Sequence, residues 1–124
     1  MRAPGFVVSL SADQEAWRAK ARAAANAGGL EGVAALPEHP QREALVYLLR
    51  ERGEVDLIAE RYVGADVLAT LSDQVRAWFA THDRLDPAGF KEITGLSRRM
   101  AIPLLEWLDG RGVTRRVGDA RIKG

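Results

Sequence analysis

Residues 95–124 read GLSRRMAIPLLEWLDGRGVTRRVGDARIKG, and this stretch decides the fold. It joins a serine, two arginines and an apolar pattern of helical spacing to a short basic segment with a glycine turn in its middle. Its charge is one-sided, because seven cations meet three carboxylates: Arg98, Arg99, Arg111, Arg115, Arg116, Arg121 and Lys123 against Glu106, Asp109 and Asp119. A helix with a cationic first turn, followed by a cationic two-stranded ribbon, predicts a winged helix, a module that commonly binds nucleic acid.

The basic segment predicts a β-hairpin, since a two-residue loop containing glycine, Gly118-Asp119, closes tight antiparallel turns. This loop places Arg116 opposite Arg121, and two opposed arginines repel by roughly 0.2 to 1 kcal/mol unless an anion lies between them. We expect phosphate to be that anion; the alternative is a solvated face. Because side chains alternate, the expected inner face holds Val113, Arg115, Val117, Ala120 and Ile122, and the outer face Thr114, Arg116, Arg121 and Lys123.

The start of the preceding helix strengthens the phosphate interpretation. Ser97 is expected to cap this helix, and its hydroxyl, Arg98, Arg99 and free backbone N–H groups gather at a positive helix end that favours phosphate. Pro103 lies inside the pattern, where it removes one backbone hydrogen bond and predicts a bend. Asp86 and Pro87 predict the cap and first turn of a shorter helix that Gly95 ends.

The rest of the chain predicts a second unit of the same design. Positions 59 residues apart match: Arg52-Gly53 with Arg111-Gly112, Leu45 with Leu104, and Leu49 with Leu108. Other expected elements are a strand at Phe6–Leu10, an alanine-rich helix between the capping box of Ser11 and Gln14 and the stop at Gly28, helices over Leu30–Leu36 and from Pro40 to Gly53, a hairpin over 54–63, and a helix capped by Asp66.

These elements predict a mostly α fold with small β-hairpins, built as two tandem winged-helix domains over 1–64 and 65–124. Units of about 60 residues have marginal cores, and no Ser- or Pro-rich linker separates them, so we expect a shared interface near Gly64. Trp78 lies on an apolar stripe and is expected in the core, whereas Trp107 lies off the leucine face of its helix and is expected to fill the interface.

Composition excludes several functions for this stretch of 124 residues. Without cysteine there is no disulfide or thiolate metal site, and His39 and His82 lack the spacing of metal ligands. Carboxylates such as Glu54 and Asp56 are interpreted as solvated charge, and no phosphate-binding loop is present, so we expect neither catalysis nor a metal or cofactor. No apolar run approaches a membrane span, and a cytoplasmic monomer is expected. The net charge of +1 confines nucleic-acid binding to a local patch.

Residues 90–122 resemble the carboxy-terminal end of bacterial selenocysteine-specific elongation factors. The shared features are Thr94-Gly95-Leu96-Ser97-Arg98-Arg99, Ala101-Ile102-Pro103-Leu104-Leu105-Glu106, Asp109, and Val113-Thr114-Arg115-Arg116-Val117-Gly118-Asp119 with Arg121. The pattern includes Pro103, which helix propensity alone does not explain. Residues 6–64 match only in their order of elements.

This resemblance implies the last two winged helices of a longer factor, whose GTP, selenocysteyl-tRNA and ribosome contacts lie in other parts. It implies that the final winged helix binds an mRNA hairpin marking a UGA codon for selenocysteine. The RNA-facing positions would be Ser97, Arg98, Arg99, Arg115, Arg116, Gly118, Asp119 and Arg121, to which the expected outer face adds Lys123. An RNA loop presents outward-turned bases that a narrow A-form major groove hides, and Asp119 is a candidate acceptor for a guanine edge.

Two alternatives stay open at this point. A winged helix more often enters the DNA major groove as part of a dimeric regulator, although no dimerisation helix or heptad pattern is visible in the sequence. A protein-interaction module with an acidic partner is the other. For that role the first unit is the better candidate, since Pro40-Gln41-Arg42-Glu43 lacks the arginine pair.

Overall fold

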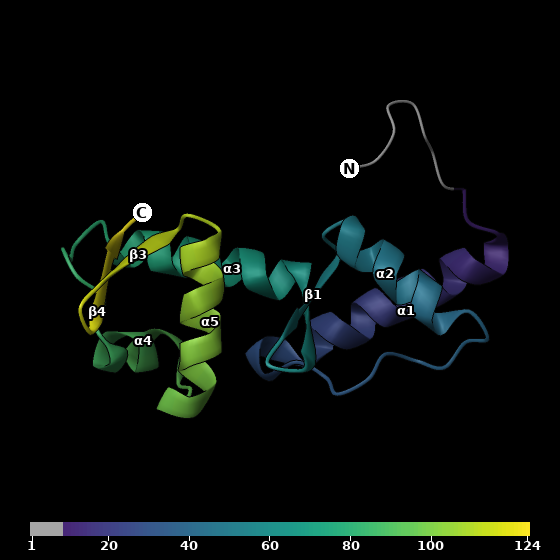
Figure 1. Ribbon diagram of the computed structural model, residues 1–124, viewed down its shortest axis with the longest axis horizontal. Coiled ribbons are helices and arrows are strands. Elements are labelled where there is room, and N and C mark those ends of the chain that lie inside the picture. The colour runs from purple at the N-terminus through teal and green to yellow at the C-terminus, as the bar shows by residue number, and fades with distance from the viewer. Residues whose placement is uncertain (1–8) are drawn as a thin grey trace.

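The computed structural model describes residues 9–124 and consists of two similar halves that lie end to end (Figure 1). We call α1 to β2 the first winged helix and α3 to β4 the second winged helix. The strand predicted at Phe6–Leu10 falls largely outside the described residues, and Ser9 and Leu10 lie in no strand. The elements are α1 (Ala12–Ala27), the 3-10 turn η1 (Gly29–Glu31), α2 (Arg42–Glu51), β1 (Val55–Ile58), β2 (Arg61–Gly64), α3 (Ala65–Trp78), α4 (Pro87–Thr94), α5 (Arg98–Gly110), β3 (Thr114–Val117) and β4 (Ala120–Lys123).

Helix α1 begins at the predicted capping box. The hydroxyl of Ser11 accepts a hydrogen bond from the backbone N–H of Gln14 at 3.2 Å, and the Gln14 side chain accepts one from the N–H of Ser11 at 3.0 Å. The inner face of α1 buries Trp17, Ala21 and Ala25. Because both alanines are small, the backbone of β2 packs closely against this helix.

The helix predicted over Leu30–Leu36 is wrong: only η1 forms, and the chain then runs extended beside β2. Val33 and Tyr62 exchange backbone hydrogen bonds of 2.9 and 2.8 Å. Gly32 makes this approach possible, since it has a φ of 69° and a Cβ there would lie 2.7 Å from the Tyr62 carbonyl oxygen. Sheet pairing therefore overrides the leucine spacing. The next helix, α2, begins at Arg42 rather than at Pro40.

The 59-residue repeat is confirmed in three dimensions. Helices α2 and α5, which precede the two hairpins, end in the same way, with Gly53 at a φ of 72° and Gly112 at 74°. The four leucines matched by the repeat are buried. Strand bounds follow the same offset, and Tyr62 and Arg121 each pair with a loop residue, Val33 and Leu85 respectively. Each wing is thereby a two-stranded hairpin with one added backbone bridge.

The two halves meet without an intervening loop, because β2 ends at Gly64 and α3 begins at Ala65. The expected Asp66 cap is wrong: Gly64 is the N-cap residue, and the Asp66 carboxylate instead accepts hydrogen bonds from Asn26 and Arg22, both at 3.2 Å. Asn26 lies so close to Gly64 that any side chain at position 64 would collide with it. The start of α3 is therefore fixed against α1.

Two apolar cores support the two halves, and the second extends into the first. Val63 on β2 is buried among residues of the second winged helix, and Leu30 and Ile58 pack against the same cluster. The second core consists of Val63, Leu68, Leu71, Val75, Leu85, Phe90, Ala101, Leu104, Leu105, Leu108 and Val113. The first consists of Trp17, Ala21, Ala25, Leu36, Leu45, Leu49 and Val55. Within residues 9–124, none of the helices has the length and apolar character needed to cross a bilayer.

Candidate nucleic-acid interface

The start of α5 is held by a short turn after α4. Asp86 caps α4 by accepting a hydrogen bond from the Gly89 N–H at 2.7 Å, and Gly95 ends that helix with a φ of 72°. Ser97 occupies the N-cap position of α5 as predicted, but its side chain makes no capping hydrogen bond. Its hydroxyl is therefore available to a ligand at the positive end of the helix.

The wing has the predicted register, but four of its side chains face opposite to the prediction. Thr114 pairs with Lys123, Arg115 with Ile122, Arg116 with Arg121, and Val117 with Ala120, as the sequence predicts. Thr114 and Arg121, expected outside, are only 2% and 8% exposed. Val117 and Arg115, expected inside, are exposed. The predicted facing is correct for Val113, which is buried, and for Arg116 and Lys123, which are exposed.

The Asp109 carboxylate at the end of α5 explains why Thr114 and Arg121 turn inward. The Thr114 hydroxyl donates to Asp109 Oδ1 at 2.6 Å, and Arg121 Nη2 donates to Asp109 Oδ2 at 3.1 Å. Asp109, whose side chain is 25% exposed, therefore supplies an anion for the inward-turned Arg121 within the protein. The Arg121 Nε atom is buried and has no hydrogen-bond partner among the described residues. Buried donors without a partner are uncommon in folded proteins.

A small hollow of about 100 Å³ lies between the start of α5, the first turn of α4 and the wing. Four of the sequence-predicted residues line it together: Arg98, Arg116, Asp119 and Arg121. Arg116 Nε donates to the Gly118 carbonyl at 3.1 Å, which orders the turn beside the hollow. The hollow therefore combines three guanidinium groups with two carboxylates, Glu106 and Asp119, a donor and acceptor set that suits a phosphate or the edge of a base.

The other predicted residues lie around this hollow rather than in it. Ser97 and Arg99 line a neighbouring groove that the hairpin tip of the first winged helix completes with Ile58 and Arg61. Lys123 pairs with Thr114 at the end of the wing away from its turn. Within residues 9–124, none of the exposed cations Arg98, Arg99, Arg115, Arg116 and Lys123 forms an ion pair.

Two residues that complete the interface were missed by sequence reasoning. Asp109 was counted as a negative charge and as a shared family feature but was given no role, and Thr114 was assigned to the outer face. The signal available was their spacing, because Asp109 ends the apolar stripe of α5 and Thr114 opens the strand that returns beside it. Glu54 was likewise misjudged as solvated: it is 8% exposed and pairs with Arg22 at 3.3 Å.

The three tryptophans have separate structural roles. Trp17 is buried in the first core and donates to the Pro37 carbonyl at 2.9 Å. Trp78 packs against the second core as predicted, and His82 stacks on it with ring centroids 3.7 Å apart. Trp107 lies between the halves, also as predicted, and donates to Asp56 Oδ2 at 2.7 Å. Trp17 is therefore too buried to stack on a base of an RNA ligand.

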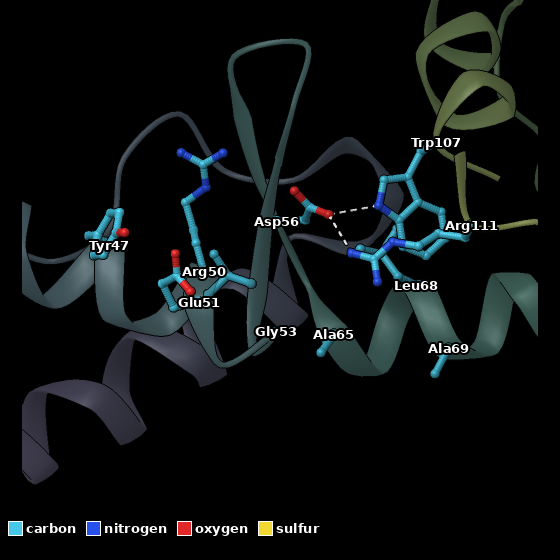
Figure 2. A pocket seen from close by; sticks show the side chains of 11 residues that line it. Tyr47, Arg50, Glu51, Gly53, Asp56, Ala65, Leu68, Ala69, Trp107 and Arg111 are labelled. Atoms are coloured by element: carbon cyan, nitrogen blue, oxygen red, sulfur yellow. Dashed lines mark hydrogen bonds and ion pairs between the residues drawn. The ribbon is translucent and has the colours of Figure 1, made fainter. Parts of the chain in front are cut away.

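A larger cleft of about 530 Å³ lies at the junction of the two winged helices (Figure 2). Asp56 on β1 is its centre, because it accepts the hydrogen bond from Trp107 and pairs with Arg111 Nη2 at 3.2 Å. The Arg111 guanidinium also lies over the Trp107 ring, 5.0 Å from its centroid. These contacts join the wing of the first half to the end of α5.

Known proteins resemble this chain in sequence and in fold. A family model described as "Elongation factor SelB, winged helix" matches residues 77–122. A selenocysteine-specific elongation factor from Desulfomicrobium baculatum is 32% identical over 129 residues, an alignment that covers 98% of this chain and 20% of that protein. The chain thus spans about a fifth of the length of the curated relative.

Two solved structures share the fold. The mRNA-binding domain of elongation factor SelB from E. coli, in complex with SECIS RNA, matches with a TM-score of 0.66 at 20% identity, covering 92% of this chain and 98% of that one. A bacterial selenocysteine-specific elongation factor, EF-Sec, matches with a TM-score of 0.63 at 22% identity, covering 92% and 18%. Taken with the sequence matches, the tandem arrangement places the chain in the winged-helix region of the SelB elongation factors, the family to which it belongs.

Proposed function

We propose that this chain binds an mRNA stem-loop through its second winged helix and so tethers a selenocysteine-specific elongation factor to its message. The observation that carries the proposal is the hollow between α5 and the wing, where Arg98, Arg116, Asp119 and Arg121 converge. The E. coli domain of similar fold is described in complex with SECIS RNA. Among the predicted residues, Ser97, Arg99, Arg115, Gly118 and Lys123 surround the hollow and complete the proposed RNA-binding surface.

The charges around the hollow suit the backbone of a folded RNA. Five exposed cations without ion pairs neutralise phosphates on either side of a loop, and the Arg121 side chain lines the hollow itself. Asp119 at the wing tip accepts a hydrogen bond from a base edge, and a guanine edge offers such donors. The hollow thus reads a loop base while the surrounding cations hold the stem.

The two halves have different proposed roles, divided at residues 1–64 and 65–124. The first winged helix orients the second, because its wing places Asp56 against Trp107 and Arg111. The 59-residue repeat aligns Asp56 with Arg115, so the same wing position carries a carboxylate in the first half and a cation in the second. GTP binding, selenocysteyl-tRNA and ribosome contacts belong to other parts of the factor, and this region contributes binding rather than catalysis. A cytoplasmic location and a monomeric state accompany this role.

A competition experiment tests the proposal. The protein is bound to a labelled RNA stem-loop with an unpaired loop guanine and challenged with duplex DNA, with the same stem lacking its loop, and with loop-base substitutions. We expect only the intact stem-loop to compete well. Equal competition by duplex DNA would replace the RNA proposal by that of a DNA-binding winged helix.

The salt dependence of the affinity counts the phosphates involved. About five contacts give a slope of log affinity against log salt of about −4. Arg76→Ala is a suitable control, because Arg76 lies on α3 in an exposed pair with Asp73 at 3.8 Å and outside the proposed surface. A slope near zero would show that the cations around the hollow bind no backbone.

A further inference from the structure

The cleft at the junction of the two winged helices has unused binding groups on its α2 side. Tyr47 and Arg50 lie three residues apart on α2, so that they share one face of the helix. Both line the cleft, together with Trp107 and Arg111 from α5 (Figure 2). The volume of the cleft, about 530 Å³, lies within the usual range for small-molecule pockets.

Tyr47 presents an aromatic ring to solvent. It is 66% exposed, the most exposed large apolar side chain among the described residues. The Glu51 carboxylate one turn later raises the pKa of Tyr47 above its ordinary value, so the ring is neutral. Its apolar face contributes nothing to either core.

Arg50 presents a guanidinium group without a partner. Within residues 9–124 it forms no ion pair, and Figure 2 shows it extending from α2 without an interaction to the residues drawn around it. The other lining arginine, Arg111, is already engaged, since Asp56 accepts hydrogen bonds from Trp107 and Arg111. Among the described residues that line the cleft, Arg50 is therefore the cation without an ion pair.

An exposed aromatic ring beside an unpaired guanidinium is the pairing that binds unpaired nucleotides. The ring stacks on a base, whichever base it is, and the guanidinium neutralises the adjoining phosphate. An acidic peptide would use the arginine and leave the aromatic face of Tyr47 uncovered, so the combination favours single-stranded nucleic acid over a protein partner.

The distance between the cleft and the hollow can be spanned by a short single strand of an RNA whose stem-loop binds in the hollow, as proposed. Arg98 lines the hollow at the first turn of α5, and Arg111 lines the cleft just beyond its last turn. Thirteen helical steps separate these residues, which corresponds to about 20 Å along the helix. A strand of a few nucleotides leaving an RNA stem spans that length.

We propose that this junction cleft is a second RNA-binding site, which takes an unpaired nucleotide flanking the stem-loop by stacking its base on Tyr47 and pairing its phosphate with Arg50. This proposal rests on the proposed function, because the stem-loop on the second winged helix brings its flanking strand to the cleft. The flanking strand is read without sequence preference, since stacking and charge carry the contact.

The test compares a blunt stem-loop with stem-loops that carry about eight unpaired nucleotides on the 5′ or the 3′ side, a length within the site sizes of single-strand binders. We expect one of the two extensions to strengthen binding to the unaltered protein about tenfold. Tyr47→Ala or Arg50→Ala should each remove most of this gain and leave the affinity for the blunt stem-loop unchanged.

Matched variants separate stacking from loss of structure. Tyr47→Phe keeps the ring and loses only the hydroxyl, so it should retain the gain, and Arg50→Lys should retain part of it. A 5-bromouridine placed in the extension should cross-link to the peptide of α2. Extensions that give no gain, or variants that weaken blunt and extended RNA equally, would overturn the cleft proposal.

Failure of the two proposals gives different results. If the blunt stem-loop binds and its extensions add nothing, the proposed function stands and the cleft proposal falls. If the blunt stem-loop does not bind, the function falls, and an unstructured oligonucleotide of the same length then tests the cleft alone. Binding of that oligonucleotide that is insensitive to Tyr47→Ala would reject the cleft in that case also.

Discussion

Arg121 serves two purposes at the level of a single residue. One nitrogen of its guanidinium pairs with Asp109 inside the wing, while its Nε lies buried beside the hollow without a protein partner. Removing one partner of a buried ion pair commonly costs about 3 to 5 kcal/mol, and because the Asp109 side chain is 25% exposed we expect the lower end of that range. The Arg121 side chain therefore stabilises the wing and lines the hollow at which RNA is proposed to bind.

Arg116 and Arg121 face each other across the wing, yet their substitution should have different effects. Arg116→Ala should leave the free energy of unfolding within about 0.5 kcal/mol of the original and shallow the salt slope of RNA affinity by about one. Arg121→Ala should lower the free energy of unfolding by about 3 kcal/mol. Urea titrations and binding at several salt concentrations measure both quantities. An Arg121→Ala protein of unchanged stability would contradict the buried ion pair.

Asp109 is expected to position Arg121 for RNA. Asp109→Asn keeps oxygen and size but removes the charge, so Arg121 becomes free to turn outward as an ordinary surface cation. We expect the protein to lose most of its discrimination between the loop guanine and other loop bases, while its affinity for the stem alone stays the same or rises.

Thr114→Val is the matched control for Asp109→Asn, because it removes the other hydrogen bond to Asp109, at 2.6 Å, and leaves the charge in place. It should lower stability by about 1 to 3 kcal/mol and preserve loop discrimination. If both variants lose discrimination in proportion to their loss of stability, Asp109 has a structural role alone.

At the level of elements, two serines occupy equivalent cap positions and are used differently. Ser11 completes a capping box at α1, whereas Ser97 at α5 has the cap backbone conformation without the side-chain hydrogen bond. A serine that does not cap its helix leaves the first turn of α5 with unpaired N–H groups. That arrangement favours an anion at the start of α5 and not at the start of α1.

This difference gives a paired test. Ser11→Ala should lower the free energy of unfolding by about 1 kcal/mol, because it removes a cap, and should leave RNA affinity unchanged. Ser97→Ala should change stability by less than about 0.5 kcal/mol and weaken RNA binding severalfold. Thermal unfolding and stem-loop titration of both proteins decide the matter, and a Ser97→Ala protein with full affinity would remove Ser97 from the interface.

Local chemistry predicted many elements well. The capping box of α1, the Asp86 cap and Gly95 stop of α4 and the wing register follow from interactions within a few residues, and the 59-residue repeat is visible in the sequence itself. The extended segment around Val33 could not be predicted in this way, because its partner Tyr62 lies far along the chain. The burial of Thr114 and Arg121 was not predicted either, since both faces of the wing mix apolar and charged residues and the contacts with Asp109 decide between them.

At the level of the whole molecule, the interface between the halves depends on Asp56. Asp56→Ala removes the Trp107 hydrogen bond and the Arg111 ion pair together, and we expect it to lower the free energy of unfolding by about 1 to 3 kcal/mol. Trp107 should then become more exposed, shifting the fluorescence to longer wavelength. Asp73→Ala, which removes an exposed carboxylate from α3, is the control. Equal stability of the two variants would show that the junction contacts contribute little.

The direct passage from β2 into α3 has a mechanical consequence. Gly64 admits no side chain beside Asn26, and Val63 is buried in the second core, so rotation between the halves would break packing on both sides. A flexible tether would absorb a displacement applied at one end. This tandem instead acts as a strut of set length, and under the proposed function a shift of a message bound at the wing would reach the start of α1 undiminished.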